Sequence, residues 1–266
     1  MKVGFIGAGN MGGALAEAAK KAVGGGNVYV SASSAESAKA HAEKLGVNSL
    51  KSDEIFKECD VIFLGVKPYL IESVIKGASD TLKNRKSEYL IVTMAAGVSV
   101  DGVLNALGFA APVIRIMPNT PVKIGKGLVP YVCSEKVTEN LKAAFLKTLE
   151  FAGELTEVEE KSIDAIGALA GSGPAFVYEF IDALATAGVE CGLKKADALK
   201  YAEQTVAGAA ELALKSGVHP QILKDEVMSP GGTTVEGVHA LEKGGFKNAA
   251  MNAVVAAYKK TLALKK

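Results

Sequence analysis

The chain has 266 residues and a formal net charge of +1 at pH 7, with 49% apolar and 22% charged residues. The near-neutral charge and the scattered basic residues mean that the protein lacks a strong positive field, which would attract nucleic acids or acidic membranes. No apolar segment approaches the roughly 20 residues that a membrane-spanning helix needs. We therefore expect neither a nucleic-acid nor a membrane partner.

The N-terminus enters a strand-like segment at once, without a basic leader or a cleavable apolar segment. Three cysteines, Cys59, Cys133 and Cys191, show no paired spacing. This pattern is typical of a protein of the reducing cytoplasm, in which we expect each cysteine to be a small buried apolar residue.

In the first half of the chain, short β-rich segments alternate with amphipathic ones. Continuous apolar strands that alternate with helices predict a mostly parallel sheet covered by helices on both faces. Strands are predicted at 2–6, 27–31, 60–66, 89–94 and 112–117, with 127–133 and 152–158 as candidate extensions of the sheet. Helices are predicted at 10–23, 34–46, 52–59 and 99–108.

From about residue 158 the strand pattern stops and Ala-rich helical segments follow, at 160–192, 195–217 and 248–266. Pro174 marks a start or a kink within the first of them. The composition therefore predicts an α/β domain over 1–157 and an all-α domain over 158–266. The small-residue faces of 175–190 and 200–215 favour close helix packing, either between subunits or within a closed bundle.

A glycine-rich turn, VGFIGAGNMGGAL, follows the first predicted strand and opens the first predicted helix. In this context Gly7 permits a tight turn, Gly9 lets the backbone approach a pyrophosphate, and Gly12 lets helix and strand pack closely. The free N–H groups at the helix start would hold the anion. The turn predicts a dinucleotide site, and its alternative, a tight turn without a ligand, is disfavoured by the strand–turn–helix context.

The end of the second predicted strand bears on the choice of cofactor. NAD-selective sites carry Asp or Glu there, whereas this chain has Ala32, Ser33 and Ser34. Without a carboxylate, and with two hydroxyls as donors, the site favours NADP(H), with NAD(H) as the alternative. Lys39 is the nearest cation along the sequence. The alternative role of Ser34 is to cap the helix that follows.

Three further strands end in small or rigid loops, LGVKP (64–68), MAAGVS (94–99) and RIMPNTP (115–121). Parallel strands place these loops at the carboxyl edge of the sheet, where open α/β folds bind ligands. The loops suit a nicotinamide ribose lying across them. Lys67 is alternatively an ordinary solvated lysine.

Several motifs carry a resemblance to a known family. GFIGAGNMG, GVKP, AAGVS, RIMPNTP, EVEEKSIDAIGALAGSGPAF and SPGGTT occur in an order similar to that in pyrroline-5-carboxylate reductases. The likeness runs from Val3 to about Asn252, and GSGPAF followed by SPGGTT is its most specific part. It implies a Rossmann domain and a helical dimerisation domain, an active site built across two subunits of a homodimer or higher homo-oligomer, and the last step of proline biosynthesis. In that step NAD(P)H reduces the C=N bond of Δ1-pyrroline-5-carboxylate to give L-proline.

The resemblance, with the glycine fingerprint, also implies the site residues. We expect the cofactor to contact Gly7, Ala8, Gly9, Asn10, Met11, Gly12, Ser33, Ser34, Val66, Lys67, Pro68 and Ala96. We expect the substrate to contact Glu160, Gly232, Thr233 and Thr234.

SPGGTT (229–234) stands before a helix-like segment and suits a small ring with one carboxylate and an imine. The N–H groups of Gly232 and Thr233 at a positive helix end would bind the carboxylate. The Thr234 hydroxyl would hydrogen-bond the ring nitrogen and orient the C=N carbon, which makes Thr234 the expected catalytic residue. Thr234 or a water would return a proton to nitrogen. Alternatively, Thr233 or Thr234 only caps the helix.

Four positions depart from the family pattern and leave fine cofactor contacts and substrate affinity open: Ser52, Gly167, Glu226 and Met228. No cluster of His, Cys, Asp and Glu has metal-ligand spacing, and we expect His219 to be structural. Alternatives remain a reductase of another cyclic imine carboxylate, a β-hydroxyacid dehydrogenase, whose lysine has no counterpart in GSGPAFVYEF, and a non-catalytic NADP-binding protein, which would not need Thr234.

Overall fold

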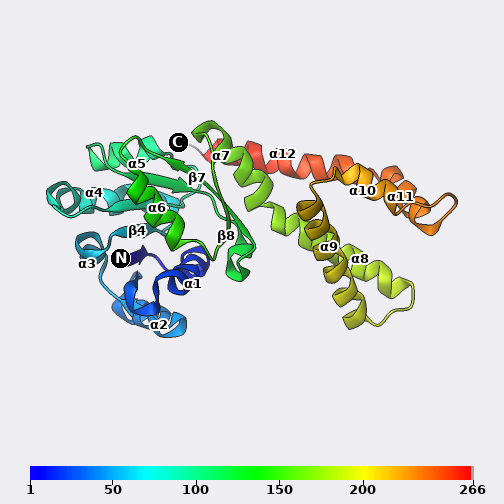
Figure 1. The fold of residues 1–266 in the computed structure, drawn as a ribbon, viewed down its shortest axis with the longest axis horizontal. Coiled ribbons are helices and arrows are strands. Elements are labelled where there is room, and N and C mark those ends of the chain that lie inside the picture. The colour runs from blue at the N-terminus through cyan, green and yellow to red at the C-terminus, as the bar shows by residue number, and fades with distance from the viewer. Residues whose placement is uncertain (265–266) are drawn as a thin grey trace. The chain divides into compact units, whose positions relative to one another are not determined.

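The computed structural model describes residues 1–264, drawn as a ribbon in Figure 1. Its internal contacts divide the chain into two units. The first is Met1–Ser172 together with the end of the last helix from Ala257, and the second is Gly173–Ala256. The boundary expected at 157/158 stays a prediction.

The first unit is built on a sheet of eight strands within the described chain, in the order β3-β2-β1-β4-β5-β6-β7-β8. Strands β1 to β6 pair in parallel, β7 runs antiparallel to β6, and β8 is parallel to β7. The mostly parallel sheet is therefore confirmed, with both candidate extensions included. The strands are β1 Val3–Ile6, β2 Val28–Ser31, β3 Asn48–Ser49, β4 Val61–Leu64, β5 Leu90–Thr93, β6 Val113–Ile116, β7 Gly127–Cys133 and β8 Gly153–Glu157.

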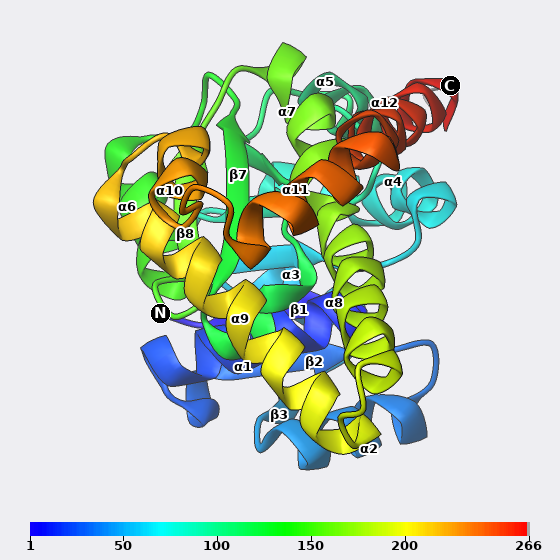
Figure 2. The ribbon, with the colours of Figure 1, turned by 90° about the vertical axis from the view of Figure 1, so that its right-hand side faces the viewer.

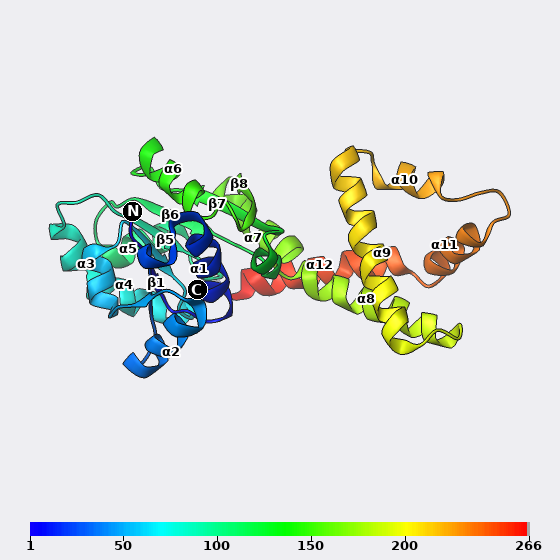
Figure 3. The same cartoon turned by 60° about the horizontal axis from the view of Figure 1, so that its bottom comes forward.

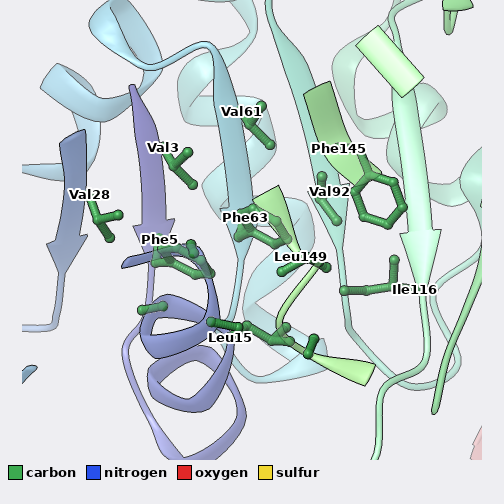
Figure 4. Packing of buried hydrophobic residues seen from close by; sticks show 14 of the residues in the cluster. Val3, Phe5, Leu15, Val28, Val61, Phe63, Val92, Ile116, Phe145 and Leu149 are labelled. Carbon is green, nitrogen blue, oxygen red and sulfur yellow. The ribbon is translucent and has the colours of Figure 1, made fainter. Parts of the chain in front are cut away.

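Helices cover both faces of this sheet. They are α1 Asn10–Val23, α2 Ala35–Leu45, α3 Ser52–Glu58, α4 Pro68–Asn84, α5 Val100–Leu107, α6 Glu139–Thr148 and α7 Glu160–Ile166. Successive strand residues point to opposite faces, so β1 sends Phe5 toward α1 and Ile6 toward the α3–α5 side. Figure 4 shows Phe5, Phe63 and Leu15 packed together, and the first two rings stack with centroids 4.5 Å apart.

The sequence patterns did not predict two of these helices, α4 and α6. In α4, Pro68 occupies the first turn, where its fixed φ is favourable, and Ile71, Ile75 and Leu82 are buried along one stripe. That spacing is a helical pattern, and it begins directly after the LGVKP loop. In α6, Thr138 caps the N-terminus by accepting the N–H of Leu141.

The second unit contains α8 Gly173–Glu190, α9 Lys195–Ser216, α10 Pro220–Glu226, α11 Thr233–Lys243 and most of α12, Phe246–Leu264. The segment expected as one helix over 160–192 is interrupted by a π-helical stretch, Gly167–Gly171, and Pro174 begins α8 as expected. For the helix expected over 248–266, the last two residues, Lys265 and Lys266, lie outside the described residues.

Within the second unit, α8 and α9 lie side by side, as Figure 2 and Figure 3 both show. Their contact is made by Ala185, Ala198 and Ala202, with Ile181 at its margin. These alanines are the buried apolar residues of the described part of this unit. The helices therefore do not enclose the core of a closed bundle, and that alternative is wrong.

The cysteines are only partly as expected. Cys59 is buried, but Cys133 is half-buried and Cys191 is exposed after the end of α8, where no element of this unit covers it. The expectation that all three are buried was wrong. Among residues 1–264, no helix is long and apolar enough to cross a membrane, and no group of three or more metal-ligating side chains gathers.

Candidate active site

The turn between β1 and α1 has the geometry that its glycines predict. Gly7 has φ +94°, which favours glycine, and a Cβ there would lie 2.8 Å from the carbonyl of Gly65. A Cβ on Gly12 would lie 2.2 Å from the carbonyl oxygen of Gly7. In contrast, a Cβ on Gly9 would meet no atom within 4 Å. The turn is thus closed behind Gly7 and Gly12 and open above Gly9, as an approaching pyrophosphate requires.

The N-terminus of α1 is arranged for an anion. Gly9 is the N-cap without a side-chain cap bond, and the first turn, from Asn10 and Met11, holds no acidic residue. The first N–H groups of a helix have no carbonyl partner within it, and they carry the positive end of the helix dipole. Because no side chain competes for them, these groups suit the pyrophosphate of a dinucleotide.

The sheet order places further predicted residues at the same edge. In the order 3-2-1-4-5-6 the crossover direction reverses between β1 and β4, and such a switch point opens a crevice at the carboxyl ends of the strands. Gly65, which the sequence reasoning missed, donates its N–H to the carbonyl of Ile6 at 2.8 Å and so holds LGVKP against the glycine turn. Lys67 is exposed and is the N-cap of α4, with Val66 and Pro68 on either side. Ala96 lies in a tight turn after β5, beside Gly97 with φ +76°.

Beyond the end of β2 lies a hollow of about 370 Å³ whose lining carries several hydroxyls. Ser33 and Ser34, which are expected to contact the cofactor, line it, and Ser34 also caps α2 by accepting the N–H of Ser37 at 3.1 Å. The cation at this hollow is Lys51, whereas Lys39 does not line it. The full lining is Ser31, Ala32, Ser33, Ser34, Ala35, Ala38, Ser49, Leu50, Lys51, Ser52 and Glu54.

A buried ionic cluster lies under the loop after β6. Arg115, 1% exposed, donates to Glu160 Oε1 at 2.5 Å and to Asp164 Oδ1 at 2.6 Å. The second oxygen of Glu160 is buried and has no hydrogen-bond partner among the described residues. Arg115 therefore fixes the Glu160 carboxylate while leaving one of its oxygens unused.

Asn119, another residue that sequence reasoning missed, ties the same loop to the π-helical stretch. Its side chain donates to the carbonyl of Ala170 at 3.1 Å and accepts the N–H of Leu128 at 2.9 Å. A π segment leaves carbonyls without their usual helical partners, so this amide supplies one. The rigid RIMPNTP loop is thereby held in place.

The second glycine-rich loop lies in the second unit. Gly231 has φ +69°, and Gly232 is the N-cap of α11 without a side-chain cap bond. Thr233 and Thr234 are the first two residues of that helix and are exposed, so the interpretation of either threonine as the cap is wrong. The N–H of Gly232 donates to the carbonyl of Ser229 at 3.0 Å and is not free for a carboxylate. The open N–H groups of the first turn start instead at Thr233 and Thr234.

The comparisons with known proteins agree with this arrangement. Residues 2–97 match a family model described as NADP oxidoreductase, coenzyme F420-dependent, and residues 160–264 match one described as pyrroline-5-carboxylate reductase dimerisation. Pyrroline-5-carboxylate reductase of Pisum sativum is 40% identical over 97% of this chain and 94% of its own length. The enzyme of Escherichia coli is 37% identical over 100% of this chain and 98% of its own.

The chain belongs to the pyrroline-5-carboxylate reductase family. The crystal structure of the Plasmodium falciparum enzyme with NADP bound is similar as well, with a TM-score of 0.89 and 32% identity over 100% of this chain and 98% of that one. The Rossmann-type first unit and the helical dimerisation domain expected from the sequence are thus those of a pyrroline-5-carboxylate reductase, an NAD(P)-dependent oxidoreductase.

For a reductase of this family, the four departing positions can now be placed. Ser52 lines the hollow at β2 and lies 3.0 Å from the hydroxyl of Ser31. A Cβ on Gly167 would lie 3.0 Å from the side chain of Met117 in the RIMPNTP loop, so the glycine leaves that methionine room. Glu226 ends α10, and Met228 donates its N–H to the carbonyl of Asp225 at 3.1 Å.

Proposed function

We propose that this chain reduces the C=N bond of Δ1-pyrroline-5-carboxylate to give L-proline, using NADP(H) in preference to NAD(H). Family membership supports the reaction. The observation that carries the substrate assignment is the exposed first turn of α11, where the hydroxyl of Thr234 is not used as a cap.

The residues at the sheet edge fit the dinucleotide. The open space above Gly9 and the uncompeted N–H groups of α1 would hold the pyrophosphate, with Ala8, Asn10 and Met11 around it. Val66, Lys67, Pro68 and Ala96 would line the nicotinamide side. Bound NADPH supplies the hydride for the imine carbon. Ser33 and Ser34, where a carboxylate would select NAD, support the preference for NADP(H).

The second loop would hold the substrate. The N–H groups of Thr233 and Thr234 stand at the positive end of α11 and suit the single carboxylate of the ring. The hydroxyl of Thr234 would hydrogen-bond the ring nitrogen and fix the ring's orientation. As the C=N bond is reduced, a proton would reach nitrogen from a water or from Thr234, whose own proton is then replaced from solvent. Gly232 shapes this turn, because a Cβ there would lie 2.3 Å from the hydroxyl oxygen of Ser229.

Glu160 would complete the substrate site from the first unit. Arg115 holds one of its carboxylate oxygens, and the buried second oxygen has no hydrogen-bond partner among the described residues. A buried acceptor without a partner is costly, so a ligand that donates to it is favoured. The reduced ring nitrogen of L-proline is protonated and carries two N–H groups, and one of them would be that donor.

The second unit supports a homodimer, or a larger homo-oligomer built from dimers, with an active site that uses both subunits. The dimerisation model matches this part of the chain, and its helices bury few apolar side chains on their own. A second copy would cover them. The cytoplasmic location expected from the sequence stays a prediction.

The test is NADPH oxidation by the purified protein on addition of Δ1-pyrroline-5-carboxylate, for wild type, Thr234→Ala and Thr234→Ser. We expect Thr234→Ala to lower kcat/KM by about 100-fold, because the removed hydroxyl acts on the reacting nitrogen, and Thr234→Ser to keep most of the activity. Thr233→Ala is the matched control, since it keeps the backbone N–H and should lose little.

Three outcomes would contradict parts of the proposal. NADPH binding without imine reduction would remove the substrate assignment and leave the dinucleotide site. Activity unaffected by Thr234→Ala would reduce SPGGTT to a structural turn. A six-membered cyclic imino acid reduced faster than the five-membered one would favour the alternative of another cyclic imine carboxylate.

A further inference from the structure

We infer that Lys51 is the residue by which this chain selects NADP(H) over NAD(H), through an ion pair with the 2′-phosphate on the adenosine ribose. The inference rests on the proposed dinucleotide site but not on the identity of the imine. Lys51 belongs to none of the motifs that identify the family, and its place in the site is visible only in the fold.

The first support is position. In this fold the second strand of the dinucleotide unit ends at the adenosine ribose, and here β2 ends at Ser31 beside the hollow of about 370 Å³. Two segments of the chain line that hollow: the turn after β2, which carries Ser33, and the start of α3, which carries Lys51. A 2′-phosphate entering the hollow would therefore meet hydroxyls from both segments and the ammonium of Lys51.

The second support is that the backbone of Lys51 is fixed while its side chain is free. Its N–H donates to Glu54 Oε2 at 2.9 Å, and its carbonyl accepts the N–H of Ile55 at 3.0 Å. The side chain is exposed and, within residues 1–264, the ammonium makes no ion pair. In contrast, Lys57 on the same helix approaches Asp53, at 3.9 Å. Lys51 is thus an unpaired cation with an anchored base.

The charges around the hollow make this lysine decisive. Glu54 lines the hollow, and its carboxylate is engaged by the N–H of Lys51. Glu36 follows the lining residue Ala35 along α2, and its own backbone N–H and the hydroxyl of Ser34 lower the pKa of its carboxyl. A carboxylate that lines the hollow disfavours a bound phosphate, so a nearby cation is needed to make binding favourable. The described lining residues supply one cation, Lys51.

The test compares ligands that differ only by the 2′-phosphate. Adenosine 2′,5′-bisphosphate and 5′-AMP are titrated by calorimetry, and NADPH and NADH by fluorescence, into wild type, Lys51→Met, Lys51→Arg and Lys39→Met. We expect Lys51→Met to weaken the bisphosphate and NADPH by about tenfold, because one charge-assisted contact to phosphate is lost, and to leave 5′-AMP and NADH within about twofold. Its NADPH affinity should also depend less on salt.

The controls separate charge from structure. Lys51→Arg should keep the preference, since a guanidinium also pairs with phosphate, and Lys39→Met should behave as wild type because Lys39 does not line the hollow. Equal loss for NADPH and NADH in Lys51→Met, or no loss for either, would overturn the inference. Failure to reduce the imine would leave these binding ratios untouched, so the two proposals fail separately.

Discussion

The two units of the molecule differ in how much of their apolar surface they bury. In the first, aliphatic and aromatic side chains fill both sides of the sheet, and residues such as Phe5, Phe63 and Phe145 have no exposed surface. In the second, three alanines are buried within the described residues, while Leu212, Leu214 and Met251 are 58%, 85% and 59% exposed. A long run of exposed apolar side chains on helices is typical of a surface that another chain covers.

This difference matches the division of the proposed site. The nucleotide loops are supported by a core that the first unit completes by itself, so they can be held in place before any ligand arrives. The substrate loop belongs to the unit whose apolar surface is left uncovered within one chain. The comparison therefore predicts that cofactor binding survives loss of assembly and that catalysis does not.

The largest expected effect comes from Arg115, whose side chain is buried in the first unit. Arg115→Met removes the cation between Glu160 and Asp164, and breaking a buried ion pair from one side costs about 3–5 kcal/mol. Urea denaturation followed by circular dichroism measures this loss. Lys142→Met is the control, since its pair with Glu157 is partly exposed and screened by solvent, so that its loss should cost much less. Equal losses would show that the Arg115 cluster is not a stabilising part of the first unit.

In the glycine turn, two adjacent glycines, Gly12 and Gly13, should respond differently to the same substitution. Gly12→Ala places a Cβ 2.2 Å from the carbonyl oxygen of Gly7, and the turn must open to admit it. We expect NADPH affinity to fall by about 100-fold, or about 2.7 kcal/mol. Gly13→Ala is matched in chemistry, but its nearest neighbour, the carbonyl oxygen of Ala8, is 3.4 Å away, and alanine is a better helix former. Similar affinities for the two variants in a fluorescence titration would contradict the role of Gly12.

Local sequence patterns predicted most strands of the first unit. Outside the motifs, they predicted few of the residues that line its candidate cofactor site. The strands and the roles of Gly7 and Gly12 followed from apolar runs and from the fingerprint, which are local signals. Lys51 could not be found that way, because it reaches the hollow through the pairing of β3 with β2, in which Tyr29 lies opposite Asn48, 19 residues further along the chain. Lys39, the cation nearest to Ser33 and Ser34 along the sequence, does not line the hollow.

In the second unit, the sequence predicted most helices but not what their exposed faces pack against. Of its helices, α8, α9, α11 and α12 were predicted from the sequence and α10 was not. Ala-rich segments cannot distinguish a bundle from an interface, since small residues pack closely in both. The choice needed the burial of Ala185, Ala198 and Ala202 against the exposure of their neighbours. Likewise, the threonines of SPGGTT could be placed inside the helix, and not at its cap, only once Gly232 was seen to begin it.

A charge on the exposed face of the second unit tests the comparison directly. In the double variant Leu212→Glu and Met251→Glu, we expect association to weaken by about tenfold or more, because a carboxylate is costly to desolvate in an interface. Analytical ultracentrifugation reports the assembly, and NADPH fluorescence should be retained while imine reduction falls. Phe151→Glu, at a 46% exposed position of the first unit, is the control. An intact oligomer in the double variant would place the interface elsewhere.

The smallest effect is a pH dependence that belongs to the packed unit. Burial raises the pKa of the Cys59 thiol from 9.0 to about 12. The unfolded thiol therefore ionises first, and the stability that Cys59 contributes is complete below pH 9 and is lost as pH rises toward 12. Between about pH 8 and about pH 10, the destabilisation caused by Cys59→Ala should shrink by about 1.4 kcal/mol, since the thiol's own contribution falls by that amount.

Val61→Ala, a truncation in the neighbouring strand β4 without a titrating group, should cost the same at both pH values. Urea denaturation of the three proteins at each pH gives the two differences. If Cys59→Ala costs the same free energy of unfolding at both pH values, the thiol is solvated in the native protein. The first unit would then be less tightly packed around Cys59 than the burial of this residue indicates.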